Sequence, residues 1–306
     1  MKRTLAASLI FALVLMSGCG LFGIGGKKNK SKEPEETSEA LAYERVQTAL
    51  EAGNFDVAIQ RLEYLETRFP FGRYGEQAQL EIVYAHFMKG DYDAAIVAAE
   101  RFISLHPVHP KADYAYYLMG MSHFQRDRGY FDRMLGAPEY TKDTTGTQLA
   151  FAAFRELVTR FPRSPYAKDA KTRMAYLRNV LAQAEVNVAQ YYLTNDIWVA
   201  AANRASGVVE NYPSTPAVAE ALAILVEANY KLGLEDPAND ALRVLATNFP
   251  DYENFDGEGN LIIREGIRNR DRSWLNVMTF GFLGKPPTPP PIQIKVPAER
   301  PEASDE

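Results

Sequence analysis

The chain has a single cysteine, Cys19, among 306 residues. An intrachain disulfide is therefore excluded, and stability has to come from a hydrophobic core. The sequence also lacks the H-E-x-x-H, G-x-S-x-G and P-loop patterns of metalloproteases, serine hydrolases and nucleotide hydrolases. These absences favour a protein that is not an enzyme and that uses no metal.

Histidine is also scarce, with four in the whole chain. Two of them, His106 and His109, stand in the segment "HPVHP". The prolines prevent a helix there, and no cysteine or carboxylate nearby completes a metal-binding set. We therefore predict a turn rather than a metal site at this position.

Positive charge is in short supply. The formal net charge is −5, and removal of residues 1–18 would leave 32 basic and 39 acidic residues, a net charge of −7. A nucleic-acid-binding protein needs a basic patch, so we expect no nucleic-acid partner. No apolar run beyond the N-terminus is long enough to cross a bilayer.

The first residues have the organisation of an export signal. Met1–Arg3 is basic, Leu5–Met16 is apolar, and small residues precede Cys19. This arrangement resembles the bacterial lipobox, although Met16 stands where that motif prefers leucine; a secretory signal with an incidental cysteine is the alternative. The resemblance implies a signal peptide over residues 1–18 and a diacylglyceryl and N-acyl lipid on Cys19. Two or more acyl chains hold a protein stably on a membrane.

The residue after the cysteine, Gly20, bears on the destination. In similar lipoproteins of Gram-negative bacteria an aspartate at this position favours the inner membrane. Its absence implies a lipid anchor in the outer membrane, on the periplasmic face. Residues 19–39 are rich in Gly, Lys, Ser and Glu and are predicted to form a flexible lipidated tether.

An aromatic residue followed by proline recurs along the chain, once with histidine in place of the aromatic residue. The five prolines are Pro70, Pro107, Pro162, Pro213 and Pro250. Twelve residues before them stand Ala58, Ala95, Ala150, Ala201 and Ala238. Five residues before them stand Leu65, Phe102, Leu157, Val208 and Leu245. Seventeen residues before them stand Gly53, Gly90, Thr145, Asp196 and Gly233.

These offsets have a physical interpretation as helix-turn-helix units. Glycine ends one helix in a left-handed conformation, alanine lets two helices cross closely, and proline stops the second helix. The pattern resembles the tetratricopeptide repeat. It predicts an all-α superhelical solenoid of five tetratricopeptide-like repeats over residues 40–252, with a generic helical bundle as the alternative. We expect a surface loop at about 126–146 and one long helix from Tyr166 to about Tyr192.

Three stretches carry a more specific resemblance. They are "RFPFGRYGEQAQLEIVYAHF" (68–87), "RFISLHPVHPKADYAYYLMG" (101–120) and "VAQYYLTNDIWVAAANRASGVVENYP" (188–213). They resemble the BamD (ComL) family of lipoproteins, and with the lipobox and the repeats the resemblance covers roughly residues 19–252. It implies a non-enzymatic scaffold of the outer-membrane β-barrel assembly (Bam) complex, which helps deliver unfolded outer-membrane proteins for folding and insertion.

The resemblance also implies partners and contact residues. The C-terminal repeats would bind the POTRA domain of BamA, and BamC- and BamE-like lipoproteins would be further partners. The candidates for the BamA contact are Arg204, Tyr192 and Trp198. The N-terminal repeats would bind unfolded β-barrel clients, and the candidates are Phe69, Phe71, Gly72 and Tyr74. Packing within the repeats is the alternative role of the aromatic residues in both sets.

The C-terminal part extends beyond the shortest family members. Residues 253–284 contain an apolar cluster between Trp274 and Phe282, and they either cap the last repeat or bind a partner. Residues 285–306 are proline-rich and then acidic, and are predicted to be disordered. The alternative function is a periplasmic repeat lipoprotein that coordinates peptidoglycan synthesis or cell division, which a coiled-coil segment would favour; the sequence shows no such segment.

Overall fold

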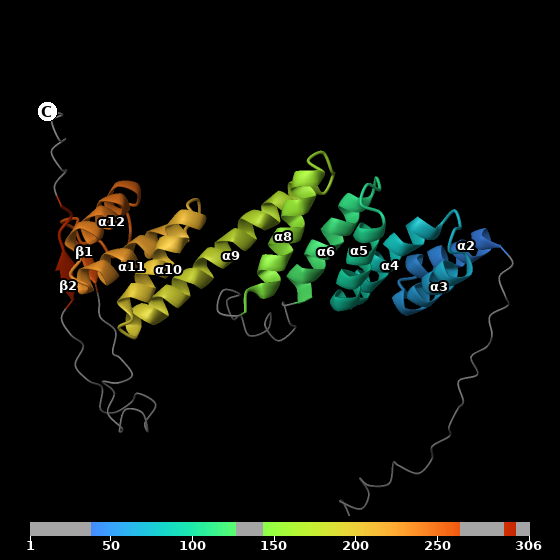
Figure 1. Ribbon diagram of the computed structural model, residues 1–306, viewed down its shortest axis with the longest axis horizontal. Helices are drawn as coiled ribbons and strands as arrows, with labels where there is room; N and C mark the ends of the chain where they lie inside the picture. The colour runs from blue at the N-terminus through green and yellow to red at the C-terminus, as the bar shows by residue number, and fades with distance from the viewer. Residues whose placement is uncertain (1–37, 127–142, 264–290, 298–306) are drawn as a thin grey trace, which may run out of the picture.

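The computed structural model describes residues 38–126, 143–263 and 291–297, and in these ranges it has ten α-helices and two short strands (Figure 1). The first five helices are α2 (Glu39–Glu51), α3 (Phe55–Arg68), α4 (Gly75–Lys89), α5 (Tyr92–Leu105) and α6 (Ala112–Arg126). The next five are α8 (Thr145–Arg160), α9 (Ala167–Thr194), α10 (Trp198–Asn211), α11 (Ala217–Lys231) and α12 (Glu235–Asn248). The strands are β1 (Leu261–Ile263) and β2 (Ile292–Ile294). Helices that follow one another in sequence pack side by side, which gives an elongated array (Figure 1).

The helices form five hairpins, α2–α3, α4–α5, α6–α8, α9–α10 and α11–α12. The second helix of each hairpin ends directly before the residue that precedes proline. That residue is the C-cap, and its N–H donates to the carbonyl four positions earlier. The predicted all-α solenoid of five tetratricopeptide-like repeats is confirmed.

Four hairpins turn between their helices at a left-handed residue. Gly53, Gly90 and Gly233 have φ values of 68°, 82° and 74°, and Asp196 has a φ of 62°. This conformation costs an L-residue about 1–2 kcal/mol and is tolerated best by glycine, asparagine and aspartate, which explains the recurring residue types. The third hairpin differs because Thr145 is the first residue of α8.

The repeated alanines and apolar residues form the core between the helices. The alanines twelve positions before the prolines are at most 2% exposed: Ala58, Ala95, Ala150, Ala201 and Ala238. The apolar residues five positions before the prolines are at most 1% exposed: Leu65, Phe102, Leu157, Val208 and Leu245. Each large side chain buried in this way contributes about 1.5–3 kcal/mol to folding, so the repeated offsets mark the stabilising contacts.

Helix α9 is a continuous helix of 28 residues, as predicted. Its first half packs through Ala170 and Leu177 on α8, and its second half packs through Val186 and Ala189 on α10 and α11. It therefore joins repeats one to three to repeats four and five. The predicted loop at 126–146 falls mainly on residues 127–142, outside the described residues.

Helix α2 begins at Glu39, which was predicted to be the last residue of the tether. The side chain of Ser38 caps this helix by accepting the N–H of Leu41 at 3.3 Å. The helix therefore starts one residue earlier than predicted. Cys19 and the signal peptide lie outside the described residues. Within the described ranges, no helix is long and apolar enough to span a membrane.

A small antiparallel sheet covers the end of the last hairpin. In it Leu261 of β1 pairs with Ile294 of β2, and Ile263 pairs with Ile292. Leu261, Ile263 and Ile294 are buried in one cluster with apolar residues of α11 and α12. These are Val218, Leu222, Val226, Leu242 and Leu245. The sheet thus takes the place that a further repeat would occupy in a longer solenoid.

Strand β2 lies within residues 285–306, which were predicted to be disordered. That prediction is wrong for residues 292–294. Isoleucines at alternating positions place one apolar face on the core, although prolines stand on both sides of the strand. The apolar cluster between Trp274 and Phe282 lies outside the described residues.

Candidate functional site

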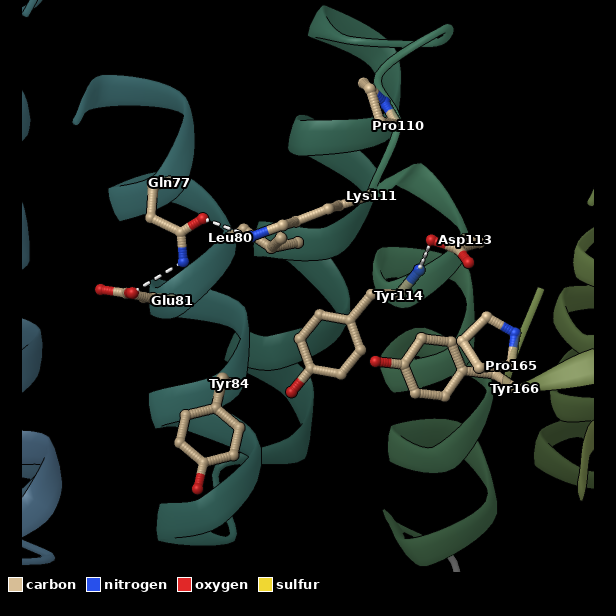
Figure 2. Close-up of a pocket in the computed structure, with 10 residues that line it drawn as sticks. All are labelled: Gln77, Leu80, Glu81, Tyr84, Pro110, Lys111, Asp113, Tyr114, Pro165 and Tyr166. Carbon is tan, nitrogen blue, oxygen red and sulfur yellow. Dashed lines mark hydrogen bonds between the residues drawn. The ribbon is translucent and has the colours of Figure 1, made fainter. Parts of the chain in front are cut away.

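A groove of about 470 Å³ crosses the first helices of repeats two and three (Figure 2). Its walls come from α4, from α6 with the turn before it, and from the turn before α9. The lining residues are Gln77, Leu80, Glu81, Tyr84, Pro110, Lys111, Asp113, Tyr114, Pro165 and Tyr166. The groove therefore combines three tyrosines with charged groups of both signs.

A chain of hydrogen bonds runs along one wall of the groove. Lys111 Nζ donates to Gln77 Oε1 at 2.9 Å, and Gln77 Nε2 donates to Glu81 Oε1 at 2.7 Å (Figure 2). Glu81 also accepts from the Tyr43 hydroxyl at 2.7 Å and from Gln47 Nε2 at 3.0 Å, both on α2. The Glu81 carboxylate is thus held by three neutral donors beside the tyrosines.

Two tyrosines of the groove, Tyr114 and Tyr166, have raised pKa values and are neutral hydrogen-bonding groups near pH 7. Burial raises the pKa of Tyr114, and the neighbouring phenols of Tyr166 and Tyr84 raise it further. Burial and the hydrogen bond to Glu81 raise the pKa of Tyr43. The rings of Tyr114 and Tyr166 lie 5.3 Å apart. Such a surface offers flat apolar faces and hydroxyl groups to an extended polypeptide.

The predicted client residues lie together in the turn between α3 and α4. We call this turn, residues 69–74, the client turn. Phe71 is 101% exposed, whereas Phe69 and Tyr74 are partly buried against the core of repeat one. The Tyr74 ring stacks on Tyr43, with ring centroids 4.2 Å apart and an interplanar angle of 9°. Because Tyr43 also bonds Glu81, the turn is continuous with the groove. The sequence prediction missed the groove tyrosines, whose signal was tyrosine on, or directly before, the first helices of successive repeats.

The three predicted BamA-contact residues differ in how exposed their side chains are. Arg204 is half exposed and pairs with Glu185 of α9 at 2.9 Å. Tyr192 and Trp198 are partly buried and pack on the core of repeat four. Tyr191, next to them, is 65% exposed. Two of the three predicted side chains therefore support the repeat, and their surface neighbours are the accessible groups.

The N-cap residue that directly follows each left-handed turn differs between the two halves of the solenoid. In repeats one and two, Asn54 and Asp91 cap their helices by accepting N–H groups with their side chains. In repeats four and five, Ile197 and Leu234 occupy the same position without a side-chain cap, and they are 47% and 48% exposed. A missing cap costs about 0.5–2 kcal/mol, so an apolar residue at this position needs another explanation.

These two residues belong to a larger exposed apolar set on repeats four and five. Val199 is 59% exposed and Tyr230 is 48% exposed. We call the set the apolar edge; it consists of Tyr191, Ile197, Val199, Tyr230 and Leu234. All five lie in or near the turn between the two helices of their hairpin, α9–α10 or α11–α12. Exposed apolar surface is a common feature of protein-interaction sites, so the apolar edge is a second candidate site.

The HPVHP segment forms the predicted turn, between α5 and α6. A carboxylate from another helix reaches the two histidines of this turn. Glu76 of α4 lies 3.5 Å from His106 Nδ1 and 3.4 Å from His109 Nε2. It was missed because it is thirty positions away in the sequence. In the part of the chain that is described, no group of three or more His, Cys, Asp or Glu side chains is placed to hold a metal ion.

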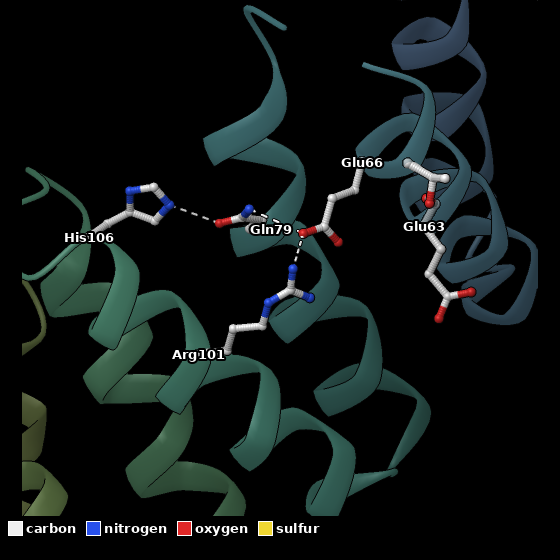
Figure 3. A network of polar contacts seen from close by, with 6 residues as sticks. Glu63, Glu66, Gln79, Arg101 and His106 are labelled. Atoms are coloured by element: carbon white, nitrogen blue, oxygen red, sulfur yellow. Dashed lines mark hydrogen bonds and ion pairs between the residues drawn. The ribbon is translucent and has the colours of Figure 1, made fainter. Parts of the chain in front are cut away.

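His106 also ends a polar network that ties repeats one and two together (Figure 3). Its Nε2 lies 2.9 Å from Gln79 Oε1, and Gln79 Nε2 donates to Glu66 at 3.2 Å. Arg101 of α5 donates to the same Glu66 carboxylate. The network connects α3, α4 and α5, so it fixes the stacking of the first two hairpins beside the client turn.

Comparison with known proteins gives a consistent result. The YfiO family model, described as "Outer membrane lipoprotein", matches residues 35–245. The outer membrane protein assembly factor BamD of Vibrio cholerae is 35% identical over 242 residues, which cover 78% of this chain and 96% of that protein. BamD of Neisseria meningitidis serogroup A is 39% identical over 249 residues, covering 81% and 91%. BamD of Haemophilus influenzae is 33% identical over 248 residues, covering 81% and 92%.

Proposed function

Because this chain belongs to the BamD family of outer membrane protein assembly factors, we propose that it works as a scaffold with two separate polypeptide-binding surfaces. The chain is an outer-membrane lipoprotein and a non-enzymatic assembly factor. In the proposal, Cys19 carries the lipid anchor. The groove and the turn at 69–74 bind unfolded β-barrel clients, and the apolar edge with Arg204 binds the POTRA domain of BamA.

The observation that carries the client half of the proposal is the tyrosine-lined groove beside an exposed phenylalanine. An unfolded barrel strand is extended and alternates apolar with polar side chains. Tyr84, Tyr114 and Tyr166 supply apolar faces for the first kind of side chain. Glu81 and Lys111 supply charged partners for the second kind and for the peptide groups between them.

The BamA half of the proposal is supported by the uncapped helices of repeats four and five. Exposed isoleucine and leucine at Ile197 and Leu234 reduce helix stability, and a partner that covers them would offset that loss. Arg204 adds a planar guanidinium suited to a carboxylate on the partner. BamC- and BamE-like lipoproteins are further proposed partners, with no surface assigned to them.

Site-directed photo-crosslinking tests the client half. A photo-reactive residue at Tyr114 should crosslink to an unfolded barrel protein during its assembly. The same residue at Val97, which is 64% exposed on α5 and lies outside the groove, should not. Equal crosslinking at both positions would count against the groove.

Depletion of the protein separates the proposal from the alternative function. Loss of an assembly scaffold should lower the amounts of many outer-membrane barrel proteins together. Division defects with normal barrel proteins would instead favour a role in peptidoglycan synthesis or cell division.

A further inference from the structure

Glu39, the first residue of α2, contacts the turn that precedes α4. Its Oε1 accepts the backbone N–H of Tyr74 at 2.7 Å, across 35 positions of sequence. Tyr74 is the N-cap residue of α4, and its own side chain makes no capping hydrogen bond. A carboxylate at a helix N-terminus satisfies a free N–H group and interacts favourably with the helix dipole. Glu39 therefore supplies from another helix the cap that α4 lacks.

The same carboxylate lies directly against Gly72. A Cβ built on Gly72 would be 2.2 Å from Glu39 Oε1 and 2.5 Å from Glu39 Cδ. Glycine at this position therefore leaves the room that the carboxylate occupies. The turn itself is closed by hydrogen bonds from Gly72 N to Phe69 O at 3.0 Å and from Gly75 N to Gly72 O at 3.2 Å. Glu39 thus touches the turn at its centre and at its end.

A second contact reinforces the first. Tyr43, one turn further along α2, stacks on Tyr74 and donates its hydroxyl to Glu81 in the groove wall. Helix α2 is therefore attached to the client turn by Glu39 and to the groove by Tyr43. Phe71, directly before Gly72, is the side chain that the turn leaves fully exposed.

We propose that Glu39 is a positioning residue that holds the turn at 69–74 in the geometry that presents Phe71 to a client. This proposal rests on the proposed client-binding function of the turn. Because Glu39 is both the last residue of the predicted tether and the first residue of α2, the geometry of the turn depends on how α2 is docked. The tether-proximal helix is in this way coupled to client binding without touching the client.

The contact can be tested separately from the function. In Glu39→Ala, the amide of Tyr74 should exchange hydrogen about tenfold faster, as expected when a hydrogen bond to a charged group is lost. Glu39→Gln keeps an acceptor oxygen in the same place and should restore most of the protection. Glu44→Ala, at an exposed glutamate of the same helix, is the matched control and should leave Tyr74 unchanged. Unchanged exchange in Glu39→Ala would overturn the proposal.

Binding of a synthetic peptide from the last strand of an outer-membrane barrel protein then tests the consequence. Glu39→Ala should weaken binding about tenfold, with Glu39→Gln and Glu44→Ala close to wild type. Gly72→Ala should also weaken binding in the wild-type background. It should have little further effect in Glu39→Ala, because the carboxylate that its methyl group displaces is already gone.

The outcomes distinguish the positioning role of Glu39 from the proposed client site. Additive effects of Glu39→Ala and Gly72→Ala, or faster exchange at Tyr74 with unchanged peptide binding, would overturn the positioning role. Failure of the wild-type protein to bind the peptide at all would instead defeat the proposed client site.

Discussion

The guanidinium of Arg204 on α10 lies 2.9 Å from the carboxylate of Glu185 on α9, and both side chains are partly exposed. The pair joins the two helices of repeat four. Since exposed ion pairs contribute only about 0.2–1 kcal/mol, this pair contributes little to the stability of the repeat. It leaves the guanidinium at the surface in a fixed position, where a partner carboxylate could share it.

The first prediction concerns this ion pair. Arg204→Glu should abolish co-purification with a POTRA-containing barrel protein, because it places a second carboxylate beside Glu185 and repels one on the partner. The double variant Glu185→Arg with Arg204→Glu restores the internal pair with reversed charges and removes the repulsion between the two carboxylates, and it should still fail to co-purify. Recovery of co-purification in the double variant would mean that Arg204 acts only within the repeat.

The second prediction separates helix capping from partner binding at the apolar edge. Ile197→Asp and Leu234→Asp introduce the residue type that already caps the helix at Asp91. Each should raise the free energy of unfolding by about 0.5–2 kcal/mol in urea denaturation. The same variants should weaken binding to the POTRA domain, because they remove apolar surface. Stabilisation with unchanged binding would exclude the apolar edge as the contact.

The third prediction tests the close crossing of α6 and α8. A Cβ on Gly120 would lie 2.7 Å from Cε1 of Phe154, whose side chain is fully buried. Gly120→Ala should therefore lower the free energy of unfolding by about 1–3 kcal/mol. Gly207 is the matched control, since a Cβ there would meet no heavy atom closer than Asn211 Nδ2 at 3.9 Å. Gly207→Ala should raise the free energy of unfolding by up to about 1 kcal/mol.

The fourth prediction concerns the sheet that covers the last hairpin. Ile294 is 9% exposed in the cluster with Leu261 and Val226, whereas Gln293 on the opposite face of β2 is exposed. Ile294→Asp buries an unpaired charge and should detach β2, which exposes the apolar end of α11 and α12. We expect earlier thermal unfolding and stronger binding of a hydrophobic dye. Gln293→Asp should behave like wild type, and an equal effect of the two variants would contradict the cap.

The fifth prediction follows from the raised pKa values of Tyr43 and Tyr114. A tyrosine whose folded-state pKa exceeds its unfolded value of about 10 stabilises the protein below that pH, and the contribution is lost as the pH rises. Alkaline titration followed by tyrosinate absorbance should show a late phase that coincides with loss of helical circular dichroism. Tyr114→Phe should reduce the amplitude of that phase. Complete tyrosine ionisation before any loss of helix would refute this.

The repeat architecture was predictable because its signals are local. A left-handed glycine, an alanine twelve positions before proline and an apolar residue five positions before it all lie within one hairpin. The physical requirements of a tight turn, a close helix crossing and a helix stop are met by single residue types at fixed spacing. The position of Asp196 shows the strength of this logic, since it adopts the left-handed conformation that its register predicts.

The candidate sites were only partly predictable. The turn at 69–74 was found from its sequence, but the groove tyrosines and Glu39 were not. Tyr84, Tyr114 and Tyr166 come from three different hairpins, so their proximity depends on how successive hairpins stack. The contact between Glu39 and Tyr74 spans 35 positions, and no local pattern encodes it.

By itself, the sequence determined that this chain folds into five helical hairpins, because turn, crossing and stop signals act over a few residues each. Only the tertiary structure decided the features that combine distant segments. These are a groove lined by neighbouring repeats, a cap on α4 supplied by Glu39 of α2, and a strand at 292–294 inside a proline-rich tail. The reason is that stacking free energy is gained between segments distant in the chain, and it can outweigh the composition of any one segment.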